Sequence, residues 1–375
     1  MHKICFVATI PAVVHSFMKG HIRAAAKKWP VAIITNPDGA ELLQDMDAQF
    51  IPLSIRRRVS PWRDLLLLMR MTMLFHRERF DLVHSIMPKT GLLAMLAGRL
   101  AGVPVRLHTF TGQVWANKQG WKRSALRMFD RLIVACATHV LVDSPSQRDF
   151  LVSEGVLEPG QGIVIGHGSI CGVDAHQFHP DAQVRGMVRA ELGIGAEQTV
   201  ILFLGRLNRD KGVLDLVAAF AGIAARRNDV VLVLVGAEED VSYALVQELC
   251  GEYRDRIRRV EFTSAPQRYM AAADIFCLPS YREGFSKTLI EAAATGLPIV
   301  TCDVPGCRDA VRAGETAVLI PPQNAHALAN AIEHLLRDPA LRASMGIRGR
   351  DLAVKEYSVA RFVTANLALY ARPCE

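Results

Sequence analysis

Short apolar runs alternate with amphipathic stretches along the whole chain, a pattern typical of parallel sheets flanked by helices. In the first half, the runs predict strands at residues 4–8, 31–35, 82–84, 105–108 and 139–142. In the second half, they predict strands at residues 200–204, 230–235, 259–262, 274–278, 299–302 and 317–320. Helix-like segments separate the strands, so the chain is predicted to be an α/β protein with a parallel sheet in each half.

One stretch interrupts this alternation and predicts the domain boundary. Residues 160–180 are rich in Gly, His and Pro and show no apolar periodicity, so we expect the interdomain linker there. A terminal amphipathic helix is predicted from apolar residues at Val359, Phe362, Val363, Leu367 and Tyr370. The predicted organisation is a first domain at residues 1–170, a second at 171–357 and a terminal helix at 358–375. A chain of 375 residues is long enough for two domains with full cores.

The segment 283–291 is the richest in candidate chemistry, because it joins a predicted strand to a helix and carries two acids. Gly284 permits unusual backbone angles and Ser286 is placed to cap the helix. The first helical amides then form an anion cradle at Lys287, Thr288 and Leu289. Glu283 and Glu291 are acceptors for hydroxyl groups, so the segment suits a sugar joined to a diphosphate. The alternative is an ordinary solvated pair of glutamates.

A second strand-to-helix loop of this kind lies about eighty residues upstream. It contains Gly205-Arg206 and Lys211-Gly212 after the predicted strand 200–204. Arg206 offers a planar fork and Lys211 a compact charge, which suit a diphosphate and the negative charge that develops when it leaves. An exposed basic turn is the alternative. Because the carboxyl ends of parallel strands share one edge of a sheet, both loops are expected at one crevice.

These motifs resemble those of the retaining glycosyltransferases of family 4. The resemblance covers nearly the whole chain and rests on residues 205–206, 211–212, 260–263, 273–280, 283–291 and 294–300. It implies the GT-B fold, in which two Rossmann-like parallel-sheet domains face a central crevice and the C-terminal helix crosses back to the first domain. It also implies a donor site at Gly205, Arg206, Lys211, Phe262, Thr263, Glu283, Gly284, Phe285, Ser286, Lys287, Thr288, Leu289 and Glu291. In that site Arg206 and Lys211 hold the diphosphate, Glu283 the sugar and Glu291 the ribose.

The first domain carries the remaining catalytic candidate, His108, at the end of a predicted strand. The resemblance implies an active-site histidine that contacts the donor sugar or the acceptor near the anomeric carbon. A satisfied structural histidine is the alternative, since partly buried histidines are common. Further acceptor-site candidates follow other strands of this domain: His15, Lys19, Lys89, Thr90, Thr111 and Gly112.

Charge is concentrated in the first domain. Residues 1–170 hold 21 Lys and Arg against 12 Asp and Glu, a net charge of +9, and the remainder carries a net charge of −2. Two clusters combine base with apolar or aromatic residues and predict contact with an anionic membrane: Arg56, Arg57 and Arg58 before the apolar segment 62–80, and Trp115, Lys118, Trp121, Lys122 and Arg123. A largely buried helix beside a solvated arginine turn is the alternative for the first cluster. Nucleic acid is not expected, because no recognition motif accompanies the charge.

Other features restrict the site and the location. Asp45-Met-Asp47 has a form that holds manganese in another fold, but it follows a helix-like stretch, so we expect a surface position and neither a metal nor a cofactor. Eight cysteines without a C-x-x-C pair indicate reduced core residues. The amino terminus lacks the pattern of a signal peptide, and no apolar run is long enough to span a membrane. The expected location is cytoplasmic, peripheral at the inner face of the membrane.

The predicted activity is transfer of a hexose or N-acetylhexosamine, with retention, from a UDP-sugar to a lipid-linked glycan. The resemblance implies front-side displacement and an acceptor saccharide joined to a polyprenyl diphosphate such as undecaprenyl diphosphate. Two alternatives stay open: a nucleotide-sugar epimerase of GT-B architecture and a noncatalytic protein that binds nucleotide-sugars.

Overall fold

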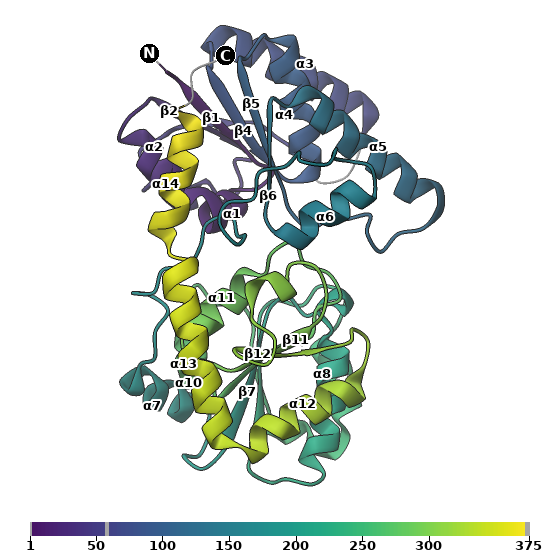
Figure 1. Ribbon diagram of the computed structural model, residues 1–375, viewed down its shortest axis with the longest axis vertical. Helices are drawn as coiled ribbons and strands as arrows, with labels where there is room; N and C mark the ends of the chain where they lie inside the picture. The colour runs from purple at the N-terminus through teal and green to yellow at the C-terminus, as the bar shows by residue number, and fades with distance from the viewer. Residues whose placement is uncertain (1, 57–59, 372–375) are drawn as a thin grey trace. The chain divides into compact units, whose positions relative to one another are not determined.

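The computed structural model describes residues 2–56 and 60–371, and the chain divides into two compact units. Unit 1 contains residues 1–171 and 359–375, and unit 2 contains residues 172–358. Each unit is built on a six-stranded parallel sheet (Figure 1). The predicted α/β architecture with two parallel sheets is therefore confirmed.

The sheet of unit 1 has the strand order β3-β2-β1-β4-β5-β6. Its strands are β1 (Ile4–Val7), β2 (Val31–Thr35), β3 (Gln49–Pro52), β4 (Leu82–Ile86), β5 (Val105–Phe110) and β6 (His139–Val142). Five of them lie within two residues of the predicted ranges. The sequence missed β3, because this edge strand is half exposed and ends in a proline, so it lacks the continuous apolar run of the others.

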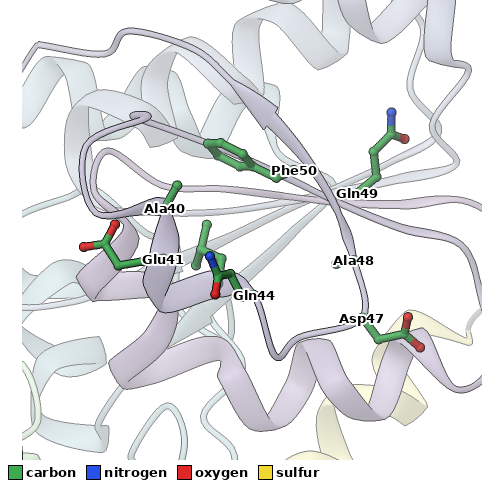
Figure 2. A pocket seen from close by; sticks show the side chains of 8 residues that line it. Ala40, Glu41, Gln44, Asp47, Ala48, Gln49 and Phe50 are labelled. Atoms are coloured by element: carbon green, nitrogen blue, oxygen red, sulfur yellow. The ribbon is translucent and has the colours of Figure 1, made fainter.

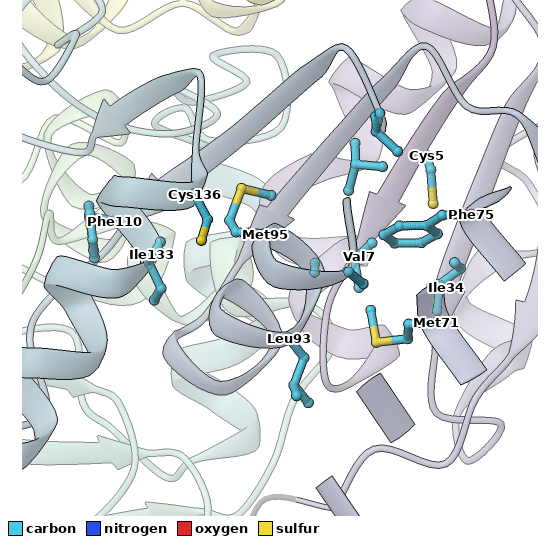
Figure 3. Close-up of a cluster of buried hydrophobic side chains, with 14 of the residues drawn as sticks. Cys5, Val7, Ile34, Met71, Phe75, Leu93, Met95, Phe110, Ile133 and Cys136 are labelled. Atoms are coloured by element: carbon cyan, nitrogen blue, oxygen red, sulfur yellow. The ribbon is translucent and has the colours of Figure 1, made fainter. Parts of the chain in front are cut away.

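Helices cover both faces of this sheet. They are α1 (Pro11–Val13), α2 (Lys19–Ala26), α3 (Pro61–Glu78), α4 (Pro88–Leu100), α5 (Gly120–Cys136), α6 (Pro145–Ser153) and α14 (Val359–Tyr370), with a π-helical turn η1 (Val14–Met18) and a 3₁₀ turn η2 (Ala40–Leu43). Successive residues of β1 enter opposite cores, because strand side chains alternate between faces. Cys5 and Val7 join α3 residues such as Phe75 in one core (Figure 3), whereas Ile4 and Phe6 join the other.

The terminal helix α14 belongs to unit 1 and lies along α2 (Figure 1). Its Tyr370 is fully buried, and the hydroxyl lies 2.9 Å from His84 Nδ1. The Tyr370 ring also meets the Phe6 ring edge-on at 5.7 Å. The predicted amphipathic helix that returns to the first domain is therefore confirmed.

The sheet of unit 2 has the order β12-β11-β10-β7-β8-β9. Its strands are β7 (Thr199–Leu204), β8 (Val230–Val235), β9 (Ile257–Val260), β10 (Ile275–Leu278), β11 (Ile299–Cys302) and β12 (Ala317–Ile320). The flanking helices are α7 (Ala182–Glu191), α8 (Val213–Ala224), α9 (Tyr243–Cys250), α10 (Pro266–Ala272), α11 (Lys287–Ala294), α12 (Ala325–Arg337) and α13 (Pro339–Glu356), with 3₁₀ turns η3 (Arg209–Lys211), η4 (Gly251–Arg256) and η5 (Arg308–Ala310). Only β9 is displaced from its prediction, by two residues, because Ile257 is buried opposite Leu232 while Phe262 is exposed.

The predicted linker at 160–180 is shared between the units. Ile163 pairs with Leu141 of β6, and the Ile170 carbonyl accepts a hydrogen bond from His21 at 2.8 Å, so this part belongs to unit 1. Val173 pairs with Ser358 and belongs to unit 2. The boundary therefore lies between residues 171 and 172.

Candidate functional site

The carboxyl edge of the unit 2 sheet brings Lys211 and Glu283 together. β7 and β10 are neighbours in the sheet, and the loops that follow them carry these two residues. Lys211 Nζ donates to Glu283 Oε1, and Ser280 Oγ donates to the same oxygen at 2.8 Å. Two donors on one oxygen hold the carboxylate in one orientation. The sequence did not indicate Ser280, which is fully buried after β10.

The β7 loop is held in shape by its own residues. Asn208 Oδ1 accepts the Lys211 backbone N–H at 2.9 Å and so caps the η3 turn. Gly212 has φ +68°, and a Cβ atom there would lie 2.0 Å from the Pro279 carbonyl oxygen. Only glycine permits this close approach between the β7 loop and the end of β10. Lys211 is therefore positioned by a cap on one side and by a glycine contact on the other.

Further contacts join the same two loops. The Tyr281 N–H donates to the Asp210 carbonyl at 2.8 Å, and the Tyr281 hydroxyl donates to Asp215 Oδ2 at 2.7 Å. Burial, together with the bond to Asp215, raises the pKa of Tyr281. Arg282 pairs with Asp210 at 3.4 Å. Sequence reasoning missed these positions because the partners are more than sixty residues apart along the chain.

The start of α11 differs from the prediction at two residues. Ser286 occupies the N-cap position, but its side chain accepts no helix amide and instead lies 3.1 Å from Thr288 Oγ1. The Leu289 N–H donates to the Ser286 carbonyl at 3.2 Å. The positive φ predicted at Gly284 is found at Gly306 (+79°), where a Cβ atom would lie 2.1 Å from the Gly284 carbonyl oxygen. The glycine that this loop needs therefore comes from the segment after β11.

The second acid, Glu291, lies on α11 and is almost completely buried. Burial raises its pKa, and Lys287, one helical turn earlier, opposes this with an ion pair of 2.8 Å. Lys287 and Glu291 therefore form a pair on the helix itself. Phe285 packs against Tyr357, with ring centroids 5.5 Å apart.

Arg206 does not contact Glu283 but pairs with Glu239, which follows β8. Asn208 Nδ2 donates to the other oxygen of this carboxylate at 2.5 Å. Glu239 therefore bridges the two side chains that border the Lys211 turn. No sequence pattern distinguishes it from the other two acids at residues 238–240.

The residues expected at the nucleotide base follow β9. Phe262 is 80% exposed. Thr263 Oγ1 accepts the Ala265 N–H at 3.0 Å. Gly205 lies at the start of the β7 loop, and its carbonyl oxygen would be 2.0 Å from a Cβ atom on Gly236. The predicted donor residues of unit 2 thus follow three strands of one sheet, β10, β7 and β9.

The acceptor candidates of unit 1 follow three adjacent strands, β1, β4 and β5. His15 lies in the π-helical turn η1, with its Nε2 3.2 Å from Lys19 Nζ. Lys89 pairs with Asp64 at 2.7 Å. The prediction for Thr90 is wrong, because the side chain is fully buried and its hydroxyl donates to the Ile86 carbonyl at 2.6 Å.

Two local irregularities mark the same edge of this sheet. The first is the π-helical turn η1 after β1, a form of helix often found at functional sites. The second is Met87 after β4, with φ +78°, an unusual value for a residue with a side chain. Thr111 and Gly112 follow β5, and the Thr111 carbonyl accepts a bond from the buried Gln113 side chain at 2.9 Å.

His108 is buried, with only 1% of its surface exposed. Its Nδ1 lies 2.8 Å from Ser85 Oγ, and its ring meets Phe110 edge-on at 4.6 Å. A Cβ atom on Gly91 would lie 2.3 Å from the ring, so α4 approaches it through a glycine. Burial lowers the pKa of His108 to about 3, so the imidazole is neutral at pH 7. These contacts favour the alternative in which His108 is a buried structural histidine.

The second predicted membrane cluster is wrong at Trp115, whereas Arg123 stays partly exposed. Trp115 is 1% exposed, its indole N–H donates to Asp130 Oδ2 at 2.7 Å, and its ring stacks on Phe150. Arg123 lies over the Trp115 ring and pairs with Glu154 at 2.5 Å. Both residues therefore contribute to the packing of α5 and α6.

The other predicted membrane residues are on the surface or outside the described part. Lys118, Trp121 and Lys122 are exposed, as is Arg56. Arg57 and Arg58 lie outside the described residues. Within residues 2–56 and 60–371, no helix combines the length and hydropathy needed to cross a bilayer.

A hollow of about 500 Å³ opens beside η2 and the edge strand β3 (Figure 2). It is lined by Ala40, Glu41, Leu43, Gln44, Asp47, Ala48, Gln49 and Phe50. Asp45 is engaged elsewhere, by Lys19 at 2.8 Å and Arg23 at 2.5 Å, and the bond from Lys19 lowers its pKa. Among the described residues, no group of three or more His, Cys, Asp or Glu is placed to hold a metal ion.

Solved structures match this two-unit architecture. Sucrose-phosphate synthase from Thermosynechococcus elongatus is 26% identical, with 99% of this chain and 98% of that chain covered and a TM-score of 0.81. The Anabaena protein HepE, solved in complex with UDP and glucose, is 19% identical, with 100% of both chains covered and a TM-score of 0.83. The chain is a two-domain GT-B protein of the glycosyltransferase class.

Sequence comparisons place it within that class. Residues 185–352 match the family of group 1 glycosyl transferases, and residues 22–168 match the glycosyl transferase 4-like domain. The chain belongs to this family of glycosyltransferases. A capsular polysaccharide biosynthesis glycosyltransferase, CapM, of Staphylococcus aureus is 28% identical over 91% of this chain and 90% of its own length.

Two further relatives cover most of the chain. The UDP-Gal:alpha-D-GlcNAc-diphosphoundecaprenol alpha-1,3-galactosyltransferase of Escherichia coli is 26% identical over 86% of this chain and 83% of its own length. The alpha-maltose-1-phosphate synthase of Mycolicibacterium smegmatis is 30% identical over 80% of this chain and 81% of its own length. The name of the first gives a diphosphoundecaprenol-linked sugar as acceptor, and the name of the second gives a maltose phosphate as product.

Proposed function

We propose that the protein transfers a hexose or N-acetylhexosamine, with retention, from a UDP-sugar to a hydroxyl group of a saccharide linked to a polyprenyl diphosphate. The observation that carries the proposal is the Lys211–Glu283 pair, which places a phosphate-binding cation beside an oriented carboxylate. The names of the relatives support it, because one transfers galactose from UDP-galactose to a diphosphoundecaprenol-linked sugar. HepE, solved with UDP and glucose, supports a UDP-sugar as donor.

In the proposed donor site, Lys211 and Arg206 bind the diphosphate and Glu283 accepts hydrogen bonds from sugar hydroxyls. Glu291 receives the ribose, and the exposed Phe262 offers a face to the base. The charge that develops on the leaving diphosphate is stabilised by Lys211 and Arg206, so the reaction needs no metal ion. Displacement of the Glu239 carboxylate frees the Arg206 guanidinium for the diphosphate.

The proposed reaction is a front-side displacement. The bond between the anomeric carbon and the diphosphate oxygen breaks on the face at which the acceptor hydroxyl attacks. The departing oxygen takes the acceptor proton, so the products are the extended saccharide and UDP. This route requires no carboxylate nucleophile on the far face of the sugar, whereas a double displacement does.

The proposed acceptor side is the carboxyl edge of the unit 1 sheet, near His15, Lys19, Lys89 and Thr111. Lysines at this edge suit the diphosphate of a lipid-linked acceptor. The neutral ring of His108 is hydrogen-bonded to Ser85, and in this proposal it supports the edge as a buried structural residue. The excess of Lys and Arg over Asp and Glu in residues 1–170 favours a position at an anionic membrane surface.

Product analysis tests the proposal. The purified chain is incubated with UDP-glucose, UDP-galactose, UDP-N-acetylglucosamine or UDP-N-acetylgalactosamine and a short-chain polyprenyl-diphosphate sugar, and the products are analysed by mass spectrometry and NMR. We expect one sugar to be added with α configuration, and Glu283→Gln to abolish the addition. The proposal fails if every donor is only epimerised, or if UDP binds and no acceptor is extended.

A further inference from the structure

The helix α3 is apolar on two opposite faces, and the core accounts for only one of them. Leu67, Met71 and Phe75 are buried in the core shown in Figure 3. The opposite face carries large apolar side chains that are between 49 and 81% exposed: Trp62, Leu65, Leu66, Met69 and Met73. Isolated apolar residues on a surface are ordinary, but five on one helical face form a continuous stripe. We call these five residues the α3 stripe.

A row of arginines borders the α3 stripe. Arg63, Arg70 and Arg77 are exposed and seven residues apart, so at 3.6 residues per turn they lie in one line along the helix. By the same helical geometry this line runs between the stripe and the buried face. The two acids of α3 are both paired with basic side chains, Asp64 with Lys89 at 2.7 Å and Glu78 with Lys3 and with Arg77 of the row, each at 2.8 Å. The rim of the stripe is therefore basic.

A second apolar surface lies on the same side of the sheet. α3 packs on α4, and α4 packs on α5 (Figure 1). α5 exposes Trp121, Met128, Phe129 and Leu132. Trp121 has Lys122 beside it, with the ammonium 5.8 Å from the ring centroid. The combination of exposed apolar side chains with a basic border thus occurs on two helices of one layer.

We propose that the α3 stripe docks unit 1 on an anionic phospholipid bilayer. Its five apolar side chains enter the boundary between headgroups and acyl chains, and the arginine row binds lipid phosphates. This proposal rests on the proposed function, which supplies the membrane-bound acceptor. It adds that the lipid surface is a binding partner and that α3 makes the contact. Docking removes the apolar side chains of the stripe from water, and this burial lowers the free energy.

Charge decides between a bilayer and a second copy of the chain. In a symmetric pair each α3 stripe faces the same stripe, so the two arginine rows would flank one seam with like charge. Residues 1–170 also carry a net charge of +9, which repels a second unit 1 and attracts an anionic surface. The observations therefore favour the bilayer.

Vesicle flotation tests the proposal with matched variants. The full chain is mixed with vesicles of phosphatidylcholine alone or of phosphatidylcholine with phosphatidylglycerol. We expect flotation with the anionic vesicles, and a loss of about tenfold or more in affinity when Leu66, Met69 and Met73 are replaced together by Ser. Replacing Arg63, Arg70 and Arg77 by Gln removes the preference for anionic vesicles.

The control places the same chemistry elsewhere. Met187 on α7 and Ile347 on α13 are also exposed apolar residues, and their joint replacement by Ser leaves flotation unchanged. Circular dichroism and light scattering of each variant verify folding and oligomeric state. Equal flotation of the stripe variant and the parent protein overturns the proposal. The proposal is also overturned if the parent protein is a dimer in solution that does not float and the stripe variant is a monomer.

The same proteins separate this proposal from the proposed function. Transfer to a short-chain, water-soluble acceptor is measured with each variant, and we expect the stripe variant to retain it. If the parent protein transfers no sugar to any acceptor but floats through the α3 stripe, the proposed function fails and the docking surface stands. If transfer proceeds and flotation does not depend on the stripe, the docking surface fails alone.

Discussion

Acidification should destabilise unit 1 through histidines that are buried as neutral rings. Burial lowers the pKa of His108 to about 3 and that of His21 to about 4, and burial also lowers that of His84. In the unfolded chain these imidazoles bind protons below the ordinary value of 6.5. Between pH 6.5 and about 4 the unfolded state therefore holds more protons than the folded state, so stability is present above pH 6.5 and is lost as pH falls.

The size of the effect follows from the pKa differences. Each unit of pH below 6.5 removes about 1.4 kcal/mol per buried histidine, so at pH 5 His21 and His108 together cost about 4 kcal/mol. Asp130 acts in the opposite direction, because burial raises its pKa from 3.8 to about 6. At pH 5 its protonation returns about 1.4 kcal/mol. The net loss from these three groups is about 3 kcal/mol, to which His84 adds in the same direction, and it is a large part of the 5 to 15 kcal/mol typical of a folded protein.

Tryptophan fluorescence reports this unit selectively, since all four tryptophans, Trp29, Trp62, Trp115 and Trp121, lie in residues 1–170. Urea unfolding followed by fluorescence from pH 7.5 to 5 gives the free energy of unfolding at each pH. His21→Gln should reduce the slope of that free energy against pH by about 1.4 kcal/mol per unit. The exposed His326 of unit 2 is the matched control, and His326→Gln should leave the slope unchanged. A free energy that is constant from pH 7.5 to 5, or a slope that His21→Gln does not alter, refutes the reasoning.

Four further outcomes are expected. Lys211→Ala should remove about 2 to 4 kcal/mol of transition-state stabilisation, the value of one pre-organised donor, and unchanged kcat/KM for the UDP-sugar would contradict its role. Glu239→Gln should tighten UDP binding in calorimetry at low salt, because the Glu239 carboxylate no longer competes with the diphosphate for Arg206. The gain should be only severalfold, because a surface ion pair is weak, and weaker binding would show that Glu239 positions the arginine instead. Gly306→Ala should cost about 1 to 3 kcal/mol by circular dichroism, since its Cβ meets the Gly284 carbonyl, whereas Gly222→Ala, in open space on α8, should not destabilise. Transfer should continue in excess EDTA after metal removal, and an absolute requirement for added manganese would exclude a reaction driven by side-chain charge alone.

The strands were predictable wherever both faces of the sheet are covered, because such strands are continuous apolar runs. β8 is buried at every position, and its predicted bounds match those observed. β3 was missed because an edge strand of four residues ending in Pro52 has neither length nor continuity. At β9, Arg258 and Arg259 separate Ile257 from Val260 and interrupt the apolar run, so the strand was predicted two residues too late.

The site was predictable in residue type but not in pairing. The sequence placed Lys211 and Glu283 at one sheet edge, because each follows a strand, yet their mutual contact depends on β7 and β10 being neighbours. Trp115 was misassigned because an indole beside basic residues suits a membrane, whereas its actual partner, Asp130, is a buried acid fifteen residues later on α5. Sequence proximity carries no information on such contacts. Backbone angles such as the positive φ of Gly306 are also decided by neighbouring loops.

The return of α14 to unit 1 makes that unit discontinuous along the chain, which affects how the protein is made. The first 171 residues emerge from the ribosome long before residues 359–371. The core around Phe6 and His84 is complete only when Tyr370 has joined it. Unit 2 is complete within one continuous stretch and can fold while the chain is still being synthesised. Unit 1 instead exposes the surface that α14 covers until residues 359–371 have been synthesised. Removal of α14 therefore damages the half of the protein encoded first.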